Sequence, residues 1–123
     1  MKTIVAITSQ NKKTISKHAG KCQNYYIYTI ENYQVTGKDF IELQADEILK
    51  NTFHQEKNKQ PKNLLFDVDI LLTGGMGSKG IELLAKQNVT AYVIKEKDPE
   101  IAIDKLIKGT LEAMAPVSHR KTY

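Results

Sequence analysis

Residues 69–94, DILLTGGMGSKGIELLAKQNVTAYVI, contain the pattern that decides the fold. A short apolar run over 70–72 is followed by four glycines within seven residues, and then by apolar residues at helical spacing over 77–88. Asn88 stands where the chain must leave this helix, and Asn tolerates the left-handed conformation needed there. Residues 90–94 again favour a strand. The stretch predicts two parallel strands connected by a helix that packs on the sheet.

Further elements are predicted on either side of this unit. They are strands over 2–8, 25–30 and 34–43, and a helix with a periodic apolar face over 44–55. Asp98 and Pro99 are typical of the N-cap and first position of a last helix, which runs to about residue 111. The order β-β-β-α-β-α-β-α predicts an α/β fold: a single three-layer domain with a mixed five-stranded sheet and helices on both faces.

The length and composition fit one domain. The chain has 123 residues, of which 41% are hydrophobic, and this is enough to bury a single core. We expect the domain to cover residues 1–112. Residues 113–123 contain Pro116 and show no periodicity, so we expect them to form a flexible carboxyl-terminal tail.

Targeting signals are not evident in the sequence. The apolar run at the amino terminus is too short for a signal peptide, and no run approaches the roughly 20 residues of a membrane span. The single cysteine fits a reducing compartment. We therefore expect a cytoplasmic protein that does not interact with a membrane.

Positive charge is concentrated in a polar loop over 9–24. This loop has no acidic residue and contains one histidine and four lysines, which are Lys12, Lys13, Lys17 and Lys21. If the strands over 2–8 and 68–72 are neighbours, the loops that follow them face the same crevice. Two interpretations stay open: the lysines only solvate the loop, or they form a positive field suited to an anionic ligand.

The glycine loop itself allows three interpretations. Residues 75–80 satisfy the G-x-G-x-x-G fingerprint of dinucleotide sites, and Glu96 lies at about the right distance to meet a ribose. However, three strands precede this loop, only 43 residues follow Gly80, and no Walker A pattern is present. The glycines can instead let the helix pack close to its strand, or help hold another anion through backbone amides at the helix start.

His18 and Cys22 are candidate metal ligands because they lie four residues apart in the most basic segment. Nearby ammonium groups are expected to lower the pKa of the thiol and to favour the thiolate that binds soft metals. The two residues do not complete a tetrahedral zinc site, since His54 lies on a predicted helix and His119 in the tail.

Other chemistry has less support. A Cys–His nucleophile pair lacks an orienting acid nearby in sequence, and the strand over 2–8 has no acid for a two-metal nuclease of the RNase H type. The tyrosines over 25–33 lie near lysines, as in sites that stack single-stranded nucleic acid, but half of them must face the core. We therefore expect neither an enzyme nor a nucleic-acid-binding protein.

Three blocks of sequence together resemble the dinitrogenase iron–molybdenum cofactor biosynthesis family, that is, the NifX-like proteins and the carboxyl-terminal domain of NifB. ISKHAGKCQNYYIY, over 15–28, is similar to the family's Ser-x-His-Phe-Gly-x-[Ala/Cys]-x-x-[Phe/Tyr]-x-[Ile/Val]-Tyr. Residues 69–94 are similar to its strand, Gly-x-Gly helix start and next strand, and DPEIAIDKLIKGTL, over 98–111, to its closing helix. The resemblance covers about residues 2–112.

The resemblance implies an RNase H-like domain that binds or carries a metal–sulfur cluster and is not an enzyme. The cluster would be an iron–sulfur, iron–molybdenum or copper–molybdenum sulfide, weakly or non-covalently held, and the role would lie in cofactor assembly. Implied partners are cluster donor and acceptor proteins, with the chain a monomer or weak dimer. The alternative is a protein that binds a nucleotide or phosphorylated small ligand through residues 75–80.

The site follows from matched positions. His18 matches the family's loop histidine, Gly20 its glycine, and Cys22 a position that is Cys or Ala; the sequence departs from the family at Ala19, where Phe is usual. His18 and Cys22 are the implied metal ligands. The residues expected to contact the cluster are Lys17, His18, Gly20, Lys21, Gly75, Met76, Gly77 and Ser78.

Overall fold

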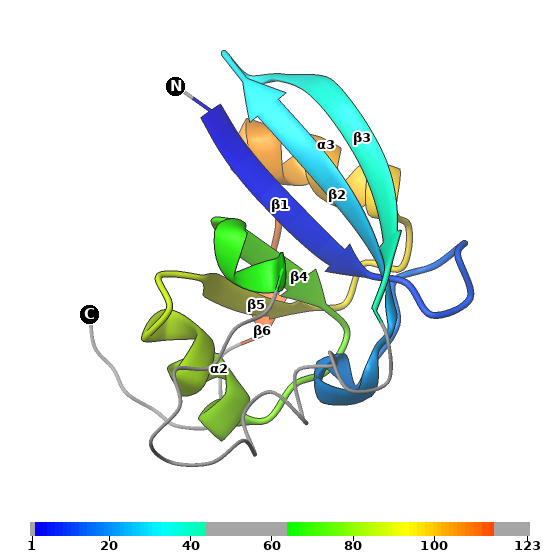
Figure 1. Ribbon diagram of the computed structural model, residues 1–123. Coiled ribbons are helices and arrows are strands. Elements are labelled where there is room, and N and C mark those ends of the chain that lie inside the picture. Colours follow the sequence, from blue (N-terminus) through cyan, green and yellow to red (C-terminus); the bar gives the residue numbers. More distant parts are fainter. Residues whose placement is uncertain (1, 44–63, 115–123) are drawn as a thin grey trace.

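A mixed sheet with the strand order β3-β2-β1-β4-β5-β6 forms the centre of the protein (Figure 1). The computed structural model describes residues 2–43 and 64–114. The strands are β1 (Lys2–Thr8), β2 (Asn24–Glu31), β3 (Gln34–Glu42), β4 (Ile70–Thr73), β5 (Thr90–Ile94) and β6 (Ala113–Met114). The helices are α2 (Ser78–Ala85) and α3 (Pro99–Lys108), with 3-10 turns η1 (Ala19–Lys21) and η3 (Leu64–Asp67). Strands β1, β4 and β5 are parallel, and the other pairings are antiparallel.

The predicted α/β fold is confirmed, with its five strands and its last two helices. The helix predicted over 44–55 lies outside the described residues. Strand β4 starts two residues later than predicted because η3 precedes it, and α2 ends before Asn88, whose φ of 66° takes the chain out of the helical region. Strand β6 was not predicted: two residues of the expected tail pair with the carboxyl end of β5.

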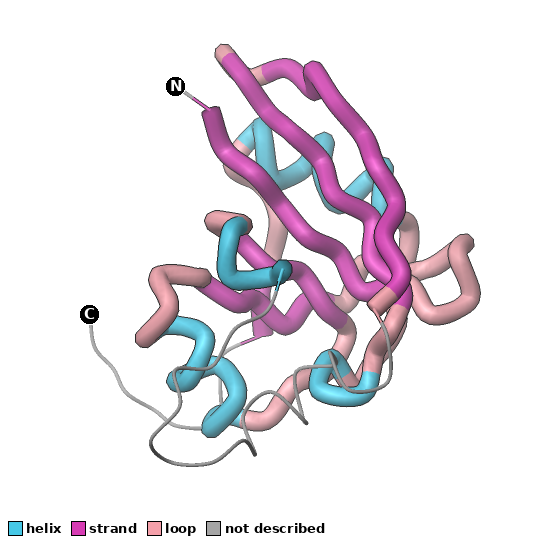
Figure 2. Tube along the Cα trace, in the orientation of Figure 1, coloured by secondary structure: helices cyan, strands magenta, loops and turns pink. Residues whose placement is uncertain are grey.

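The sheet separates two apolar cores, and α2 and α3 lie on its opposite faces (Figure 2). Along β1, Ala6 faces one core while Val5 and Ile7 face the other, as the alternation of a strand requires. Leu84 of α2 packs in the first core, and Ile103 of α3 packs in the second. This is the expected RNase H-like, three-layer arrangement.

Helix α3 begins where the sequence predicts and ends about three residues earlier than predicted. The Asp98 carboxylate accepts hydrogen bonds from the backbone N–H groups of Glu100 (2.9 Å) and Ile101 (3.3 Å), and Pro99 occupies the first turn. The helix stops at Lys108 because Gly109 adopts a left-handed conformation with φ of 75°. The chain then turns back to form β6.

Two buried threonine hydroxyls join the ends of β1 and β4. Thr8 Oγ1 donates to the carbonyl oxygen of Ser16 at 2.8 Å, and Thr73 Oγ1 lies 3.0 Å from Thr8 Oγ1 and 3.2 Å from the same carbonyl oxygen. The backbone N–H of Ser16 donates to Thr8 (2.9 Å), and that of Gly74 donates to Ser16 (2.9 Å). Because buried polar groups must find partners, these bonds hold the loop over 9–24 against the end of β4.

This loop crosses from one face of the sheet to the other. Ile15 is buried in the core on the α3 face, and its backbone N–H donates to the carbonyl of Lys97 at 2.7 Å. Ala19 is buried in the core on the α2 face, and its N–H donates to the carbonyl of Gly75 at 3.1 Å. The loop is therefore anchored to the segments that follow both β4 and β5.

A three-residue polar contact ties α3 to β2 and β3. Glu100 Oε2 accepts from the Tyr28 hydroxyl (2.8 Å) and from Lys38 Nζ (2.6 Å). The hydrogen bond from Lys38, followed by that from Tyr28, lowers the pKa of Glu100 from its usual value. The side chains of Lys38 and Glu100 are 47% and 63% exposed, so solvent screens this ion pair.

Thr73→Val should destabilise the protein, because it keeps the side-chain shape but leaves the surrounding backbone groups with one partner fewer. We expect the free energy of unfolding, measured by urea denaturation, to fall by about 1–3 kcal/mol. Thr90→Val makes the same change at an exposed position of β5 and should stay within about 0.5 kcal/mol of the wild type. Equal losses in the two variants would show that the buried hydroxyl does not stabilise the fold.

Glu100→Gln should change how stability depends on pH. A lowered carboxyl pKa contributes stability above the usual value of 4.5, and this contribution is lost as the pH falls through the lowered value. We expect the free energy of unfolding of the wild type to exceed that of the variant by at most about 1 kcal/mol at pH 7. The difference should shrink as the pH falls below 4.5 and vanish once the pH is below the lowered pKa of Glu100. Urea denaturation across this range measures it. Asp104→Asn, which breaks an exposed pair with Lys108, is the control, and matching pH profiles in both variants would contradict the assignment.

Candidate functional site

Three loops leave the same edge of the sheet, because β1, β4 and β5 are parallel. They cover residues 9–23, 74–77 and 95–98. The prediction that the first two loops meet is confirmed, since β1 pairs with β4 and the loops exchange backbone hydrogen bonds. Ligands in open α/β sheets bind at the carboxyl ends of the strands. This edge is therefore the place for the candidate site.

Gly74 and Gly75 allow the two loops to touch. A Cβ atom on Gly74 would lie 3.2 Å from the carbonyl oxygen of Ser16, and one on Gly75 would lie 3.3 Å from Cβ of Lys17. Neither position has room for a larger residue without movement of the facing loop. The close approach thus occurs between two loops and not between a helix and its strand, which corrects one of the three interpretations of the glycine run.

Gly77 has a different environment, because it opens onto free space. It is the N-cap of α2, with φ of −71° and ψ of 156°, and a Cβ atom there would meet nothing within 4 Å. No side chain caps the helix, and no described residue accepts the N–H groups of Ser78, Lys79 and Gly80. A helix start with unpaired N–H groups is positive and can accept an anion.

Met76 lies across the first turn of α2. A Cβ atom on Gly80 would lie 3.0 Å from the Met76 methyl carbon and 3.3 Å from its Cγ, so the glycine makes room for this side chain. Met76 is half-buried at the margin of the core on the α2 face, and Ser78 next to it is half-buried as well. The thioether therefore forms an apolar border beside the open helix start.

His18, Lys17 and Lys21 belong to the loop that contacts the glycine loop. His18 is exposed and left-handed, with φ of 63° and ψ of 55°, which is uncommon for residues other than glycine. Its carbonyl accepts the N–H of Lys21 at 2.9 Å, which closes the turn η1 that contains Gly20. Lys17 and Lys21 are exposed, and Lys17 packs its first side-chain carbons against Gly75. The structure thus brings Lys17 and His18 beside the glycine loop.

Cys22 is directed into the protein. It is only 3% exposed; its Sγ donates to the carbonyl of Asn24 at 3.1 Å and lies 3.6 Å from the Ser16 hydroxyl. Burial raises the pKa of the thiol and outweighs these hydrogen bonds, which act in the opposite direction. The expectation that nearby lysines lower this pKa is therefore wrong, because desolvation of the sulfur dominates.

Ala19, where the resembling family usually has Phe, lies in the core and not on the site surface. It is fully buried, and its carbonyl accepts the Tyr25 hydroxyl at 3.0 Å. Tyr25 is also fully buried in the same core. The departure from the family pattern therefore concerns the packing beneath the loop.

Among residues 2–43 and 64–114, no three His, Cys, Asp or Glu side chains form a group that could hold a metal ion. His54 and His119 lie outside this part of the chain. Within the same ranges, no helix has the length and hydropathy needed to cross a membrane.

The tyrosines of β2 do not form an open stacking surface. Tyr28 is fully buried, as is Tyr25. The ring of Tyr26 packs edge-on against Phe40, with centroids 5.0 Å apart, and Lys38 Nζ lies 5.0 Å above the Tyr26 ring. Tyr33, in the turn between β2 and β3, is 82% exposed. These rings offer no continuous platform for bases.

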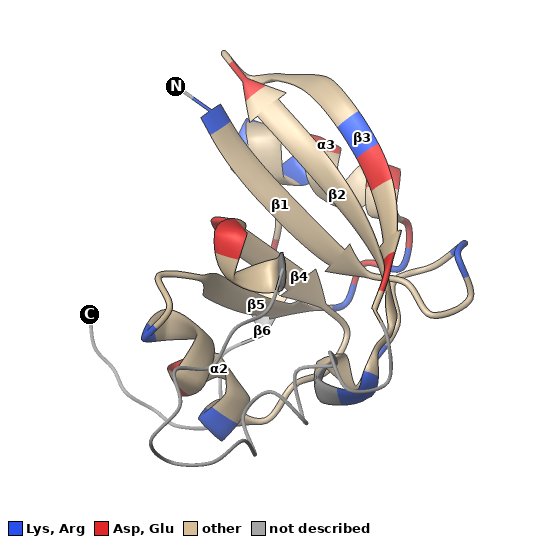
Figure 3. Ribbon diagram, in the orientation of Figure 1, with Lys and Arg blue, Asp and Glu red and all other residues tan. Residues whose placement is uncertain are grey.

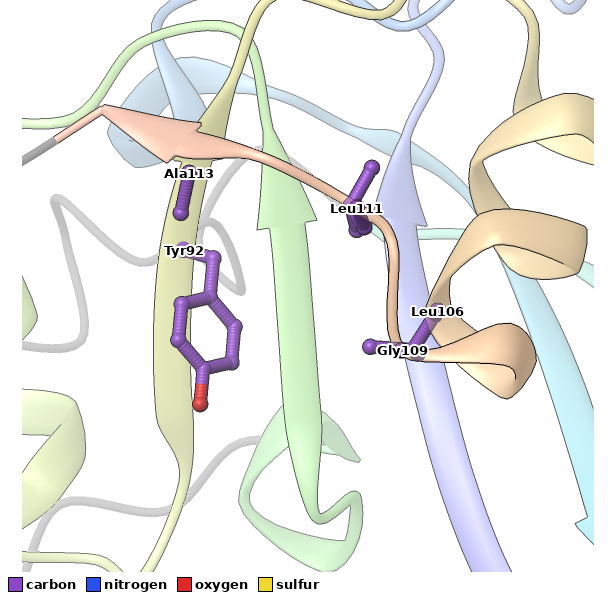
Figure 4. A pocket seen from close by; sticks show the side chains of 5 residues that line it. All are labelled: Tyr92, Leu106, Gly109, Leu111 and Ala113. Atoms are coloured by element: carbon purple, nitrogen blue, oxygen red, sulfur yellow. The ribbon is translucent and has the colours of Figure 1, made fainter.

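An apolar pocket of about 190 Å³ lies between β5, the end of α3 and the start of β6 (Figure 4). Its lining residues come from β5, the end of α3 and the segment leading into β6, and they are Tyr92, Leu106, Gly109, Leu111 and Ala113. The pocket has no charged side chain in its lining, and it includes none of the sequence-predicted site residues. It is therefore separate from the candidate site.

The positioning residues Thr8, Thr73 and Ser16 were missed by the sequence reasoning. A signal was present: Thr8 and Thr73 each end an apolar strand, directly before a polar loop. Without the pairing of β1 with β4, nothing in the sequence shows that the two hydroxyls meet.

Comparisons with solved structures show the same fold in other proteins. A candidate dinitrogenase from Methanocaldococcus jannaschii has a TM-score of 0.68 and 18% identity, over 94% of this chain and 98% of the other. A candidate NifB protein from Thermotoga has a TM-score of 0.62 and 21% identity, over 90% and 92%. The apo form of the orange protein from Desulfovibrio gigas has a TM-score of 0.67 and 13% identity, over 93% and 94%. At these identities the likeness shows the fold alone.

Sequence comparison identifies the family. No curated protein matches the chain significantly. The family described as "Dinitrogenase iron-molybdenum cofactor" matches over residues 1–109, which is most of the chain and includes all three loops of the candidate site. The resemblance seen in the sequence is thereby confirmed: this protein belongs to the dinitrogenase iron–molybdenum cofactor family.

Proposed function

We propose that this protein binds and carries an anionic metal–sulfur cluster, of the iron–sulfur, iron–molybdenum or copper–molybdenum type, in cofactor assembly. The observation that carries the proposal is the contact between the lysine loop and the glycine loop. This contact places the exposed His18 beside the loop that leads into the uncapped start of α2. Membership in a family named for a molybdenum-containing cofactor supports the choice of ligand.

The described groups suit such a ligand chemically. Metal–sulfide clusters are anionic, and their sulfides accept hydrogen bonds. Lys17 and Lys21 supply positive charge. The N–H groups of Ser78, Lys79 and Gly80 supply donors that need no conformational change, whereas the Gly75 N–H already donates to Thr73 Oγ1 at 3.3 Å. Gly20 lies in the turn η1, before Lys21. Met76 gives the cluster an apolar neighbour.

His18 and Cys22 are the proposed metal ligands, with different access. Imidazole and thiolate are suitable for copper, iron and soft metal–sulfide centres. The imidazole of His18 is on the surface and can reach a ligand directly. Before it can bind a metal, the Cys22 sulfur must break its contacts with Asn24 and Ser16 and lose a proton. We therefore expect His18 to bind the cluster first and Cys22 to bind it second.

A carrier role agrees with the openness of the site. His18, Lys17 and Gly77 are exposed, so a donor or acceptor protein can approach the ligand without opening the fold. The proposed partners are therefore cluster donor and acceptor proteins. We propose that the protein acts without catalysis, in the cytoplasm, as a monomer or weak dimer.

The second candidate function is binding of a nucleotide or phosphorylated small ligand, which the uncapped start of α2 favours. Glu96, the residue placed to meet a ribose, is already engaged: it pairs with Lys105 at 3.3 Å and accepts the N–H groups of Lys97 and Asp98. The structure thus offers the phosphate contacts but not a free ribose acceptor. This difference makes the cluster the preferred ligand.

Anaerobic titration with tetrathiomolybdate and with iron–sulfur clusters should show saturable uptake and a visible charge-transfer band. His18→Asn should weaken uptake about tenfold or more, equal to about 1.4 kcal/mol. Asparagine accepts the left-handed backbone at this position, so the variant removes the imidazole without added strain. Cys22→Ala should weaken uptake less, because the sulfur faces inward.

Uptake that is unchanged when both substitutions are combined would remove His18 and Cys22 from the site. A wild-type protein that takes up neither probe would contradict the cluster proposal. Protection from thermal unfolding by ATP or NAD, in that case, would favour the alternative ligand class.

Gly77→Asp should raise the stability of the fold and weaken ligand binding. A Cβ atom fits at this position, and aspartate is a slightly better N-cap than glycine, so the free energy of unfolding should rise by a few tenths of a kcal/mol. The same carboxylate would repel an anionic ligand, so uptake of tetrathiomolybdate should fall.

Gly77→Asn is the matched control, because asparagine caps the helix equally without adding a charge. It should gain the same stability, measured by urea denaturation, and retain more uptake than the aspartate variant. Equal uptake by the two variants would mean that the start of α2 does not contact the anion.

A further inference from the structure

The segment after β5 belongs to the same edge of the sheet as the proposed site. Residues 95–98 follow the carboxyl end of β5, which is parallel to β4 and β1. Their backbone is fixed to the lysine loop, because Ile15 N–H donates to the carbonyl of Lys97 at 2.7 Å. Three anchored loops, and not two, therefore lie at this edge of the sheet.

The two acidic residues of this segment are engaged within their own element and α3. Glu96 accepts the N–H groups of Asp98 and Lys97 and pairs with Lys105. Asp98 caps α3 through the N–H groups of the first helical turn. Both carboxylates are thus compensated by local donors.

The two lysines of the segment, in contrast, have no carboxylate partner among the described residues. Lys95 and Lys97 are exposed and take part in none of the ion pairs in this part of the chain. The same holds for all four lysines of the first loop, which contains no acid at all: Lys12, Lys13, Lys17 and Lys21. Figure 3 shows basic residues on each of these two segments. The edge therefore carries a local excess of positive charge.

We propose that Lys95 and Lys97 form a third, charged wall of the site and select a ligand that carries two or more negative charges. Six lysines on these two mutually anchored loops have no carboxylate partner among the described residues, and they repel one another when no ligand is present. A singly charged ligand removes little of this repulsion, whereas a multiply charged anion removes more. The identity of that anion as a metal–sulfide rests on the proposed function; the charge selection follows from the lysines.

The test compares two double variants that remove the same charge. Lys95→Gln with Lys97→Gln changes the proposed wall. Lys2→Gln with Lys86→Gln is the matched control, since Lys2 starts β1 and Lys86 follows α2, and both lie at the opposite edge of the sheet. All four lysines are exposed, so none of the substitutions disturbs the core.

Both double variants and the wild type would be titrated anaerobically with tetrathiomolybdate, a dianion, at low salt and at about 0.15 M salt, where charges more than about 8 Å apart are largely screened. At low salt the wall variant should bind about tenfold or more weakly than the wild type, and the control within about twofold. The gap should narrow at the higher salt concentration.

The outcomes separate the two proposals. If the wild type takes up the cluster probe and both double variants bind it with equal affinity, the charged wall is overturned and the cluster proposal stands. Loss in the wall variant alone, with a salt-dependent gap, would support the wall. A wild type that takes up no thiomolybdate or cluster under any condition would overturn the proposed function and, with it, the wall.

Discussion

The hydrogen bonds that join Thr8, Thr73 and Ser16 are the constraint on which the candidate site depends. They lie where two parallel strands end, and both threonine hydroxyls are buried, so leaving either one without a partner costs free energy. Together with the backbone bonds from Ile15 to Lys97 and from Ala19 to Gly75, they anchor the loop over 9–24 to the sheet. With it held in place, Ile15 and Ala19 fill the cores on opposite faces, and the residues between them stay at the surface. Fold and site are thus stabilised by the same bonds.

The glycines after β4 serve three separate purposes that one sequence pattern cannot distinguish. Gly74 and Gly75 admit the facing loop, Gly80 admits the Met76 side chain, and Gly77 faces open space. Only Gly77 has room that the protein itself does not use. This explains why a match to a dinucleotide fingerprint is weak here: two of its three glycines, Gly75 and Gly80, are needed for contacts within the chain.

Acidic and basic side chains near the candidate site differ in whether they have partners within the protein. Acidic residues near the strand ends are used for structure, as Asp98 caps a helix and Glu96 pairs with Lys105. The lysines of the neighbouring loops have no such partners among the described residues. The thiol of Cys22 is also used within the fold, which leaves the imidazole of His18 as the accessible soft ligand. An open, basic site of this kind suits a ligand that must be handed on.

The sequence by itself determined the element types, the parallel pairing of β4 with β5, and the positive charge of the loop over 9–24. These follow from local periodicity, capping residues and composition, which act over a few neighbouring positions. The tertiary structure alone decided the direction of the Cys22 sulfur, the burial of Ala19, the pairing of β6 and the meeting of Thr8 with Thr73. Each of these depends on contacts between segments far apart in the chain. Their energies come from desolvation and hydrogen bonding, which exist only once the strands are side by side.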